Sequence, residues 1–394
     1  MELGEVSGYT LKVLESLSQL QAAQWDALLG ERGSPFLRYA FLYGLERCHC
    51  VGEESGWIPR YITLWEEEEL VAATPSYLKL HSQGEFIFDH SWAEAARRLR
   101  FPYYPKLVTA VPFSPVTGPR LLFAPRANEE QLRGALLEAT RALVAHEPVS
   151  GVHWLFVRED ERIFFQEQEL AVRETVQFQW VNEGYQSFED FLGCFSSKRR
   201  NQIRRERRRL HESGIYTVVY RGEAIHDQLM SEMFRFYNDT IDRYFYGQRY
   251  LNEDFFLWIG RELAESLVLI FAYREGERSP LGGALNFEQD GVLYGRYWGC
   301  DEAPPGLHFE VCSYAGIELA IKEGWRRFEA GAGGGAHKHG RGFLPRRTYS
   351  AHELYLPLIN EAVHDFVERE RAHLSDELCA LEGRILKRRP QGVR

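Results

Sequence analysis

A run of basic residues between Lys198 and Arg209 carries the side chains best suited to binding an anion. The segment SSKRRNQIRRERRRL, residues 196–210, places eight Lys and Arg residues within twelve positions. Cations at helical spacing repel one another unless an anion neutralises them, and a CoA tail, a nucleotide-linked precursor or tRNA would do so. The alternative is a solvated helix face whose cations pair with carboxylates elsewhere in the chain. The predicted phosphate-binding residues are Lys198, Arg199, Arg200, Arg204 and Arg208.

A second candidate segment is the apolar stretch 292–299, followed by Leu-His-Phe-Glu at 307–310. We expect a strand and then a helix over 308–323, and the free N–H groups of a helix start suit a phosphate or a developing oxyanion. His308 and Glu310 are two residues apart, so on a regular helix they point to different sides and are not a pair. The alternative for each is a structural hydrogen bonder. The predicted catalytic residues are Glu310, Glu329 and His308, and the predicted substrate contacts beside them are Arg296, Tyr297 and Trp298.

The glycine-rich segment 328–343 is the third candidate. Glycine lets the backbone approach a ligand closely, and the interleaved Lys338 and Arg341 suit an anionic group. The segment matches neither a Walker A loop nor a dinucleotide fingerprint, and its two histidines lack a third ligand, so no metal is expected. The alternative is a surface loop without a ligand. Ser350 and His352 follow on one face of the next expected strand and are further predicted substrate contacts.

The first half of the chain offers candidate acceptor contacts within FDHSW, YYPK and PFSPVTGPR. These segments combine aromatic walls with a few charges, which is typical of a ligand cleft. Each is equally compatible with a buried turn. The residues predicted to contact substrate are Asp89, His90, Trp92, Lys106 and Arg120.

Strands and helices alternate along the whole chain, which predicts an α/β (α+β) fold. Each half reads as an antiparallel meander, then a helix, then a strand, and Phe86–Phe88 is expected to be a short strand. We predict an N-terminal domain over 1–184 and a C-terminal domain over 185–358 that carries the basic helix 196–212. A separate amphipathic helix occupies 359–394. Its apolar seam either docks on its own domain or forms the contact of a homodimer; the seam residues are Val367, Leu374, Leu378, Leu381 and Ile385.

Bulk composition narrows the functional classes. The net charge is −10, which argues against a DNA-binding protein as a whole. The six cysteines form no C-x-x-C pair, so neither a zinc finger nor a disulfide framework is expected. The N-terminus has no signal-peptide pattern and no apolar run approaches a membrane span, so we expect a cytoplasmic protein.

Taken together, the candidate segments resemble the FemAB-like proteins of the GNAT superfamily, which are described as peptidoglycan biosynthesis or recognition proteins. The resemblance covers nearly the whole chain, and the stretches that carry it are 35–61, 86–95, 103–122, 196–208, 293–299, 307–310, 337–343 and 348–354. It implies two tandem GNAT-like domains, with mixed, mostly antiparallel sheets flanked by helices. Fem enzymes transfer amino acids from aminoacyl-tRNA to a peptidoglycan precursor, and ordinary GNAT enzymes use acyl-CoA.

The resemblance and the residues together predict a bacterial N-acyltransferase or aminoacyltransferase. Its donor is acyl-CoA or aminoacyl-tRNA, its acceptor is a small-molecule or nucleotide-linked amine such as a cell-wall precursor, and no covalently bound cofactor is expected. Pro304 and Pro305 follow the strand 292–299 and have no N–H to offer a pyrophosphate, which disfavours an acetyl-CoA donor. The alternative is a non-catalytic module that recognises an anionic precursor or RNA.

Overall fold

The computed structural model describes residues 1–30, 33–125, 127–243, 248–333 and 335–382. The chain forms two compact units. Unit 1 comprises Met1–Thr175 and Thr348–Leu374, and unit 2 comprises Val176–Arg347 together with the segment from Ser375 onward. These bounds differ from the predicted ones, because the second half of the strand 344–354 and most of the following helix belong with unit 1.

Unit 1 is built from two sets of strands and the helices beside them. One set has the order β1-β2-β4-β5-β8 and is antiparallel; the other has the order β16-β9-β7-β6-β3, in which β7 and β9 are parallel. Helix α4 buries Leu132 and Leu136 in a core with Trp154 of β9. The elements are β1 Glu2–Val6, β2 Tyr9–Leu14, α1 Ala22–Asp26, α2 Tyr39–Arg47, β3 Trp57–Pro59, β4 Tyr61–Glu66, β5 Glu69–Thr74, β6 Ser76–Lys79, α3 His90–Arg98, β7 Lys106–Thr109, β8 Leu122–Phe123, α4 Glu129–His146, β9 Gly151–Val157, α5 Glu159–Glu167 and β16 Leu344–Leu354.

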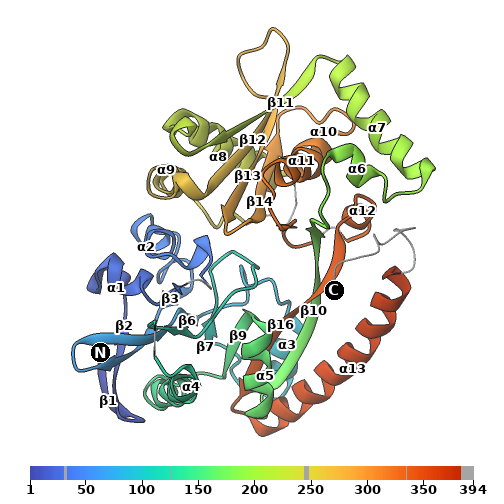
Figure 1. The fold of residues 1–394 in the computed structure, drawn as a ribbon. Helices are drawn as coiled ribbons and strands as arrows, with labels where there is room; N and C mark the ends of the chain where they lie inside the picture. The colour runs from blue at the N-terminus through green and yellow to red at the C-terminus, as the bar shows by residue number, and fades with distance from the viewer. Residues whose placement is uncertain (31–32, 126, 244–247, 334, 383–394) are drawn as a thin grey trace. The chain divides into compact units, whose positions relative to one another are not determined.

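Unit 2 has a sheet with the strand order β11-β12-β13-β14-β15-β10, in which β14 and β15 are parallel and the other neighbouring strands are antiparallel. Helices α8 and α9 cover one face, and α7, α10 and α11 lie over the other (Figure 1). The elements are β10 Ala171–Val181, α6 Phe188–Leu192, α7 Ser197–Glu212, β11 Ile215–Arg221, α8 Asp227–Asp242, α9 Glu253–Glu262, β12 Leu267–Arg274, β13 Gly282–Gln289, β14 Val292–Cys300, α10 Leu307–Phe309, the π-helical turn Glu310–Tyr314, α11 Ala315–Lys322, β15 Arg327–Glu329 and α12 Gly335–His339.

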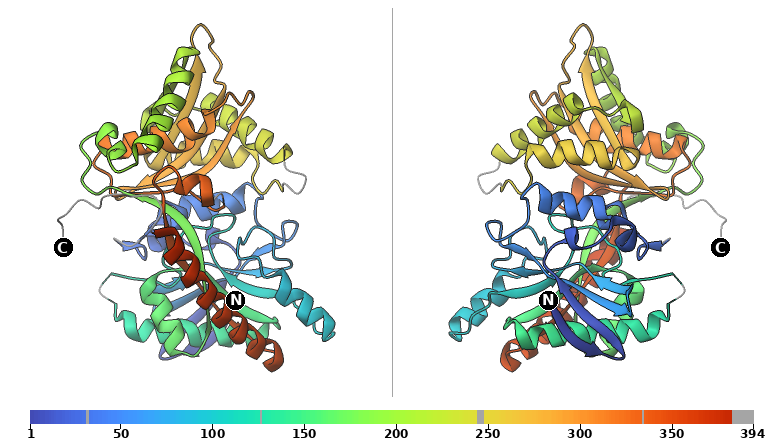
Figure 2. Two further views of the ribbon diagram at one scale, coloured as in Figure 1. Left: turned by 90° about the vertical axis from the view of Figure 1, so that its right-hand side faces the viewer. Right: turned by 90° about the vertical axis from the view of Figure 1, so that its left-hand side faces the viewer.

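Local sequence explains the elements that frame the site. Ser196 caps α7 by accepting a hydrogen bond from the N–H of Arg199 at 3.4 Å. Ile203 and Leu210, seven residues apart, are the buried residues of α7, and the helix packs beside β11. Figure 2 shows α7 from two further sides. The tight turn between β13 and β14 uses Asp290 and Gly291, both in the left-handed region at φ 52° and 71°.

The predicted fold class is confirmed: mixed, mostly antiparallel sheets are flanked by helices, and a long helix follows. The strand predicted at 86–88 is wrong, because Phe86 and Phe88 both have positive φ, 62° and 54°, which no strand adopts. The C-terminal helix, α13, spans Pro357–Glu382. It docks on unit 1 through Ile359, Val363 and Val367, which pack against Trp92. Of the predicted seam, Leu374 and Leu378 are half-buried, and the side chains of Leu381 and Ile385 lie outside the described part of the chain.

Candidate active site

The diverging ends of β14 and β15 open the candidate site in unit 2. The two strands pair in parallel only where 292–294 face 327–329. Beyond that point β14 carries a bulge: Gly295 pairs with Asn286 and Tyr297 pairs with Leu285, which leaves Arg296 as the extra residue. A bulge bends a strand and re-aims its side chains. β14 therefore turns away from β15, and a space opens between the strands.

A cavity of about 580 Å³ occupies this space. Its size suits a small ligand or the reactive end of a larger one. Five of the residues predicted from the sequence line it together: Arg296, Tyr297, Trp298, His308 and Lys338. Thr240, Asn286 and Ser313 add polar groups that the sequence did not reveal, because each comes from a different element and no local motif connects them.

His308 is the more buried of the two imidazoles that line the cavity. Its ring lies 4.6 Å from the Trp298 ring and 5.9 Å from the His337 ring, centroid to centroid. Burial, reinforced by His337, Arg341 and Lys338, lowers its pKa to about 4. The ring is therefore neutral at pH 7, and one of its nitrogens has a free lone pair to accept a proton.

Lys338 supplies a positive charge to the same cavity. Its Nζ donates to the carbonyl oxygens of Gly331, at 2.8 Å, and Ala332, at 3.3 Å. Burial lowers the pKa of Lys338 to about 8. Among the described residues that line the cavity, none is Asp or Glu. A partly buried cation without a facing carboxylate favours a ligand group with negative charge.

Cys312 also lines the cavity, but it is a poor nucleophile. Burial raises the pKa of its thiol well above the usual value, so it stays protonated. Among the residues that the structure describes, no His, Cys, Asp and Glu side chains come together in a group of three that could hold a metal. The ionisable groups that the cavity offers for proton transfer and charge stabilisation include the imidazole of His308 and the ammonium of Lys338.

The two predicted carboxylate bases lie elsewhere. Both carboxylate oxygens of Glu310 accept hydrogen bonds from Arg207, whose Nη2 also lies 2.7 Å from Glu318. Glu329 is buried at the end of β15, with Arg327 2.9 Å away. Burial raises its pKa. Neither carboxylate lines the 580 Å³ cavity, and an arginine lies beside each, so neither is placed to accept a proton there.

The face of α7 toward the π-helical turn is a network of ion pairs. Tyr314 Oη donates to Glu206 at 2.6 Å, and Arg341 lies 3.4 Å from the same carboxylate. The Arg341 guanidinium stacks on Phe309, with its Cζ 3.1 Å from the ring centroid. Arg341 is thus buried between Glu206 and Phe309. Phe309 in turn lies beside His308, which lines the 580 Å³ cavity.

The outward cations of α7 differ in how far they are matched. Arg204 lies 2.5 Å from Glu189, and Arg208 lies 3.8 Å from Glu212. Arg199 donates to Gln202 at 3.1 Å. Five cations form no ion pair with any residue in the described part of the chain; they are Lys198, Arg199, Arg200, Arg205 and Arg209.

Beside this helix is a second cavity of about 490 Å³, lined by Arg204, Arg207, Arg208 and His211, by the carboxylates Glu189 and Glu310 that pair with its arginines, and by mostly apolar residues. The spacing of the three arginines and His211, at i, i+3, i+4 and i+7, puts them on one face. That spacing was the signal by which Arg207 could have been added to the predicted set. The anion-binding prediction for α7 stays a prediction, supported by the unmatched cations.

In unit 1 the structure gathers five predicted residues into one buried polar cluster: Asp89, Trp92, Lys106, Ser350 and His352. Tyr103 and His153 join them. His90 is exposed at the first position of α3, outside the cluster. Arg120 is fully buried and donates to the carbonyl oxygens of Leu155, Pro119 and Val116. These backbone bonds occupy its guanidinium, so Arg120 is a structural residue.

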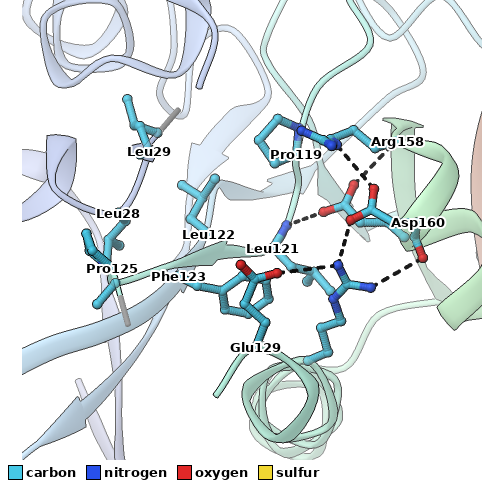
Figure 3. Close-up of a pocket in the computed structure, with 14 residues that line it drawn as sticks. Leu28, Leu29, Pro119, Leu121, Leu122, Phe123, Pro125, Glu129, Arg158 and Asp160 are labelled. Atoms are coloured by element: carbon cyan, nitrogen blue, oxygen red, sulfur yellow. Dashed lines mark hydrogen bonds and ion pairs between the residues drawn. The ribbon is translucent and has the colours of Figure 1, made fainter. Parts of the chain in front are cut away.

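Unit 1 also has a cavity of about 460 Å³, with an apolar wall that includes Leu28 and Leu122 (Figure 3). Its charged groups face one another: Arg133 lies 2.6 Å from Asp160, and Arg158 lies 3.1 Å from the same carboxylate. Glu161 accepts two backbone N–H bonds, from Arg120 and Leu121. Because these charged groups already pair with one another, the cavity is a weaker candidate for an active site than the 580 Å³ cavity of unit 2.

No described helix combines the length and apolar character that crossing a membrane requires.

The model of the FemAB-like family, described as peptidoglycan biosynthesis/recognition, matches residues 16–387. The structure of L-PGS from Bacillus licheniformis is similar at 12% identity, covering 88% of this chain and 97% of that one, with a TM-score of 0.51. The crystal structure of FemX is similar at 11% identity, covering 89% and 98%, with a TM-score of 0.52. At this identity the two similarities show a shared fold. No curated protein matches the sequence.

Proposed function

The chain belongs to the FemAB-like family, and from that premise we propose that unit 2 is an N-acyltransferase. It transfers an aminoacyl or acyl group from a phosphate-containing donor to an amine. The observation that carries the proposal is the cavity between the diverging ends of β14 and β15. A neutral imidazole and an ammonium line this cavity, and none of its described lining residues is a carboxylate.

The proposed reaction needs no covalent enzyme intermediate. The acceptor nitrogen attacks the donor carbonyl carbon and forms the new C–N bond. His308 accepts the proton that the nitrogen loses, and the ammonium of Lys338 stabilises the oxyanion. The bond from the carbonyl carbon to the donor's leaving oxygen or sulfur then breaks, and the proton on His308 goes to that leaving atom. Arg341 acts as a positioning residue, because it holds Phe309 beside His308.

The surface of α7 favours a nucleic-acid donor over acyl-CoA. The unmatched cations of this helix lie between Lys198 and Arg209, so they extend over roughly 17 Å, the length of several phosphates. The segment after β14 includes Pro304 and Pro305, which have no N–H for a pyrophosphate. We therefore favour aminoacyl-tRNA as donor and, from the family description, a cell-wall precursor as acceptor. Both occur in the cytoplasm, where we place the reaction.

The test is a transfer assay with the full chain. Labelled aminoacyl-tRNA or labelled acetyl-CoA is mixed with a nucleotide-linked muropeptide, and the product is identified by mass spectrometry. His308→Gln should lower turnover by about 100-fold or more, which is the usual effect of losing a positioned base. Lys322→Met, an exposed lysine of the same unit, is the matched control for Lys338→Met and should leave turnover unchanged. Transfer that survives both site variants would contradict the proposed roles. Saturable tRNA binding without any transfer would instead favour the non-catalytic module.

A further inference from the structure

Lys106 is the centre of a buried hydrogen-bond network in unit 1 that the proposed reaction does not use. Its Nζ donates to Glu85 Oε2 at 2.7 Å, to Ser82 Oγ at 3.0 Å and to Asp89 Oδ2. All three ammonium hydrogens are thereby engaged. Ser82 Oγ also lies 2.8 Å from Tyr104 Oη, and both hydroxyl residues are partly exposed. The network therefore reaches the surface at Ser82 and Tyr104.

A second chain of hydrogen bonds lies in the same core. Ser350 Oγ is 2.8 Å from His352 Nε2, and His352 Nδ1 is 2.8 Å from His153 Nδ1. Both imidazoles are fully buried, and burial lowers the pKa of each well below its usual value. A neutral imidazole has one N–H and one lone pair. Along the run of hydrogen bonds Ser350–His352–His153, all the donated hydrogens therefore point the same way, either toward His153 or toward Ser350.

Four polar atoms between the two chains have no hydrogen-bond partner among the described residues. They are Glu85 Oε1, Asp89 Oδ1, Trp92 Nε1 and His153 Nε2. Their residues are nearly or fully buried, with exposed fractions of 2%, 0%, 4% and 0%. The Trp92 ring stacks 6.4 Å from that of His153, and Lys106 contacts both carboxylates, so the four groups belong to one region. Buried polar atoms without partners are rare, and such a concentration indicates a missing ligand.

We propose that unit 1 binds ordered water at this place, and that the water joins the two chains into one relay from Ser82 and Tyr104 to Ser350. The unmatched atoms are two carboxylate acceptors, one indole donor and one imidazole nitrogen. A water molecule donates two hydrogen bonds and accepts two, so it satisfies this set when His153 Nε2 carries a hydrogen. The surrounding charges are Lys106, Lys79, Glu85 and Asp89, which balance one another, so a neutral ligand fits the site.

The water also fixes the direction of the histidine chain. With a hydrogen on Nε2, His153 accepts at Nδ1 from the Nδ1–H of His352. His352 then accepts at Nε2 from the hydroxyl of Ser350. In this arrangement each donor meets one acceptor, from the hydroxyl of Ser350 through His352 and His153 to the water, which donates to Asp89.

The loop that brings the carboxylates to this site is strained. Phe86 and Phe88, which flank Ile87 between Glu85 and Asp89, both occupy the left-handed region. Bulky residues are found there only where the surroundings hold them, and such strain clusters at functional sites. The local geometry of 85–89 is thus consistent with a loop shaped to place two carboxylates.

Nitrogen-15 NMR of the histidines in the full chain tests the relay. At pH 7 we expect His153 as the Nε2–H tautomer and His352 as the Nδ1–H tautomer. Ser350→Ala should turn His352 into a mixture, because its Nε2 loses the hydroxyl that donates to it. Ser34→Ala, a buried serine of the same unit outside the cluster, should leave both tautomers unchanged. The opposite tautomers, or a cationic ring at either position, would overturn the relay.

The water itself is tested by a cross-peak between bound water and the indole N–H of Trp92. We expect a slowly exchanging water in wild type and its loss in Asp89→Leu, with a crystal structure showing density within hydrogen-bond distance of Asp89 Oδ1 and His153 Nε2. A dry site, or direct contact between those two residues, would overturn the proposal even if the tautomers were as expected.

Discussion

Each unit contains a parallel pair of strands in the described part of the chain, and the two pairs differ in what occupies the space where their strands part. In unit 1, β7 and β9 pair over 107–109 and 152–154. In unit 2, β14 and β15 pair over 292–294 and 327–329. A helical segment connects the strands of each pair: α4 in unit 1, and α10 to α11 in unit 2. The first space is filled by the chain, and the second is an open cavity.

In unit 1, the space where β7 and β9 part is filled by the segment that follows β7. Residues 110–122 are almost all buried, and they reach the part of β9 that extends beyond β7 through Gly118, whose N–H donates to Phe156 O at 3.1 Å. Arg120 Nε donates to Leu155 O at 2.7 Å. Glu161 fixes the end of the segment by accepting from the N–H groups of Arg120 and Leu121. In unit 2, a bulge and glycine-rich backbone leave the equivalent place free. One strand arrangement thus serves as core in one unit and as candidate site in the other.

Arg120→Met should have the largest effect on stability, because it breaks the filling of unit 1. The carbonyl oxygens of Leu155, Pro119 and Val116 would lose buried donors, and Glu161 would lose a nearby cation. We expect unfolding free energy to fall by roughly 3 kcal/mol or more, as for other broken buried networks. Urea denaturation measures it. Arg162→Met, an arginine whose partner Glu159 is exposed, is the control and should lose less than about 1 kcal/mol. An unchanged midpoint for Arg120→Met would mean that the filling is not held by its guanidinium.

The open site of unit 2 should show its two ionisable groups in the pH dependence of transfer. His308 must be neutral to accept a proton, so activity should be lost as pH falls through about 4, the pKa to which burial lowers it. Lys338 must be charged, so activity should also fall as pH rises through about 8. Rates of labelled product formation between pH 3 and 10 measure both limbs. In Lys338→Met the whole rate should drop and the upper limb should disappear. An upper limb that persists in this variant would assign it to another group.

The sequence predicts several of the elements and site residues on which this difference between the units depends. The regular strands 267–300 and the helix 196–212 follow from apolar periodicity and turn residues, and they were predicted within a few positions. His308 and Lys338 were singled out by their neighbours in the chain. Their meeting in one cavity was not predictable, because it depends on a one-residue bulge at Arg296 that leaves no local signal.

Other failures have identifiable causes. The pattern Phe-Ile-Phe at 86–88 has the apolar character of a strand, but the burial of Glu85 and Asp89 against Lys106 overrides that propensity. Arg120 was expected to contact substrate because a charge in an aromatic, proline-rich segment is typical of a cleft. Its three carbonyl acceptors come partly from β9, far along the chain, and only the folded structure brings them to it.

Anion binding by α7 should respond more modestly than transfer does. Arg200, Arg205 and Arg209 form no ion pair with a described residue, so replacing all three by Gln removes charge without leaving a carboxylate unmatched. We expect the Kd for tRNA to rise about tenfold at low salt and the slope of log Kd against log salt to become shallower, because fewer counterions are released on binding. Filter binding across a salt series measures both. An unchanged salt slope would show that α7 is a solvated face, as its alternative interpretation holds.

The smallest expected effect concerns the matched cations on the same helix. Arg204 and Glu189 are both substantially exposed, and exposed pairs contribute little to stability because water and salt screen them. Arg204→Gln should therefore lower the unfolding free energy by less than about 1 kcal/mol. It should weaken tRNA binding less than Arg200→Gln does, since Glu189 already neutralises part of its charge. Urea denaturation and filter binding of the two single variants give the comparison. A larger loss of binding for Arg204→Gln would mean that the ligand displaces Glu189 and binds Arg204 directly, which would place the phosphates over the 490 Å³ cavity that Arg204 lines.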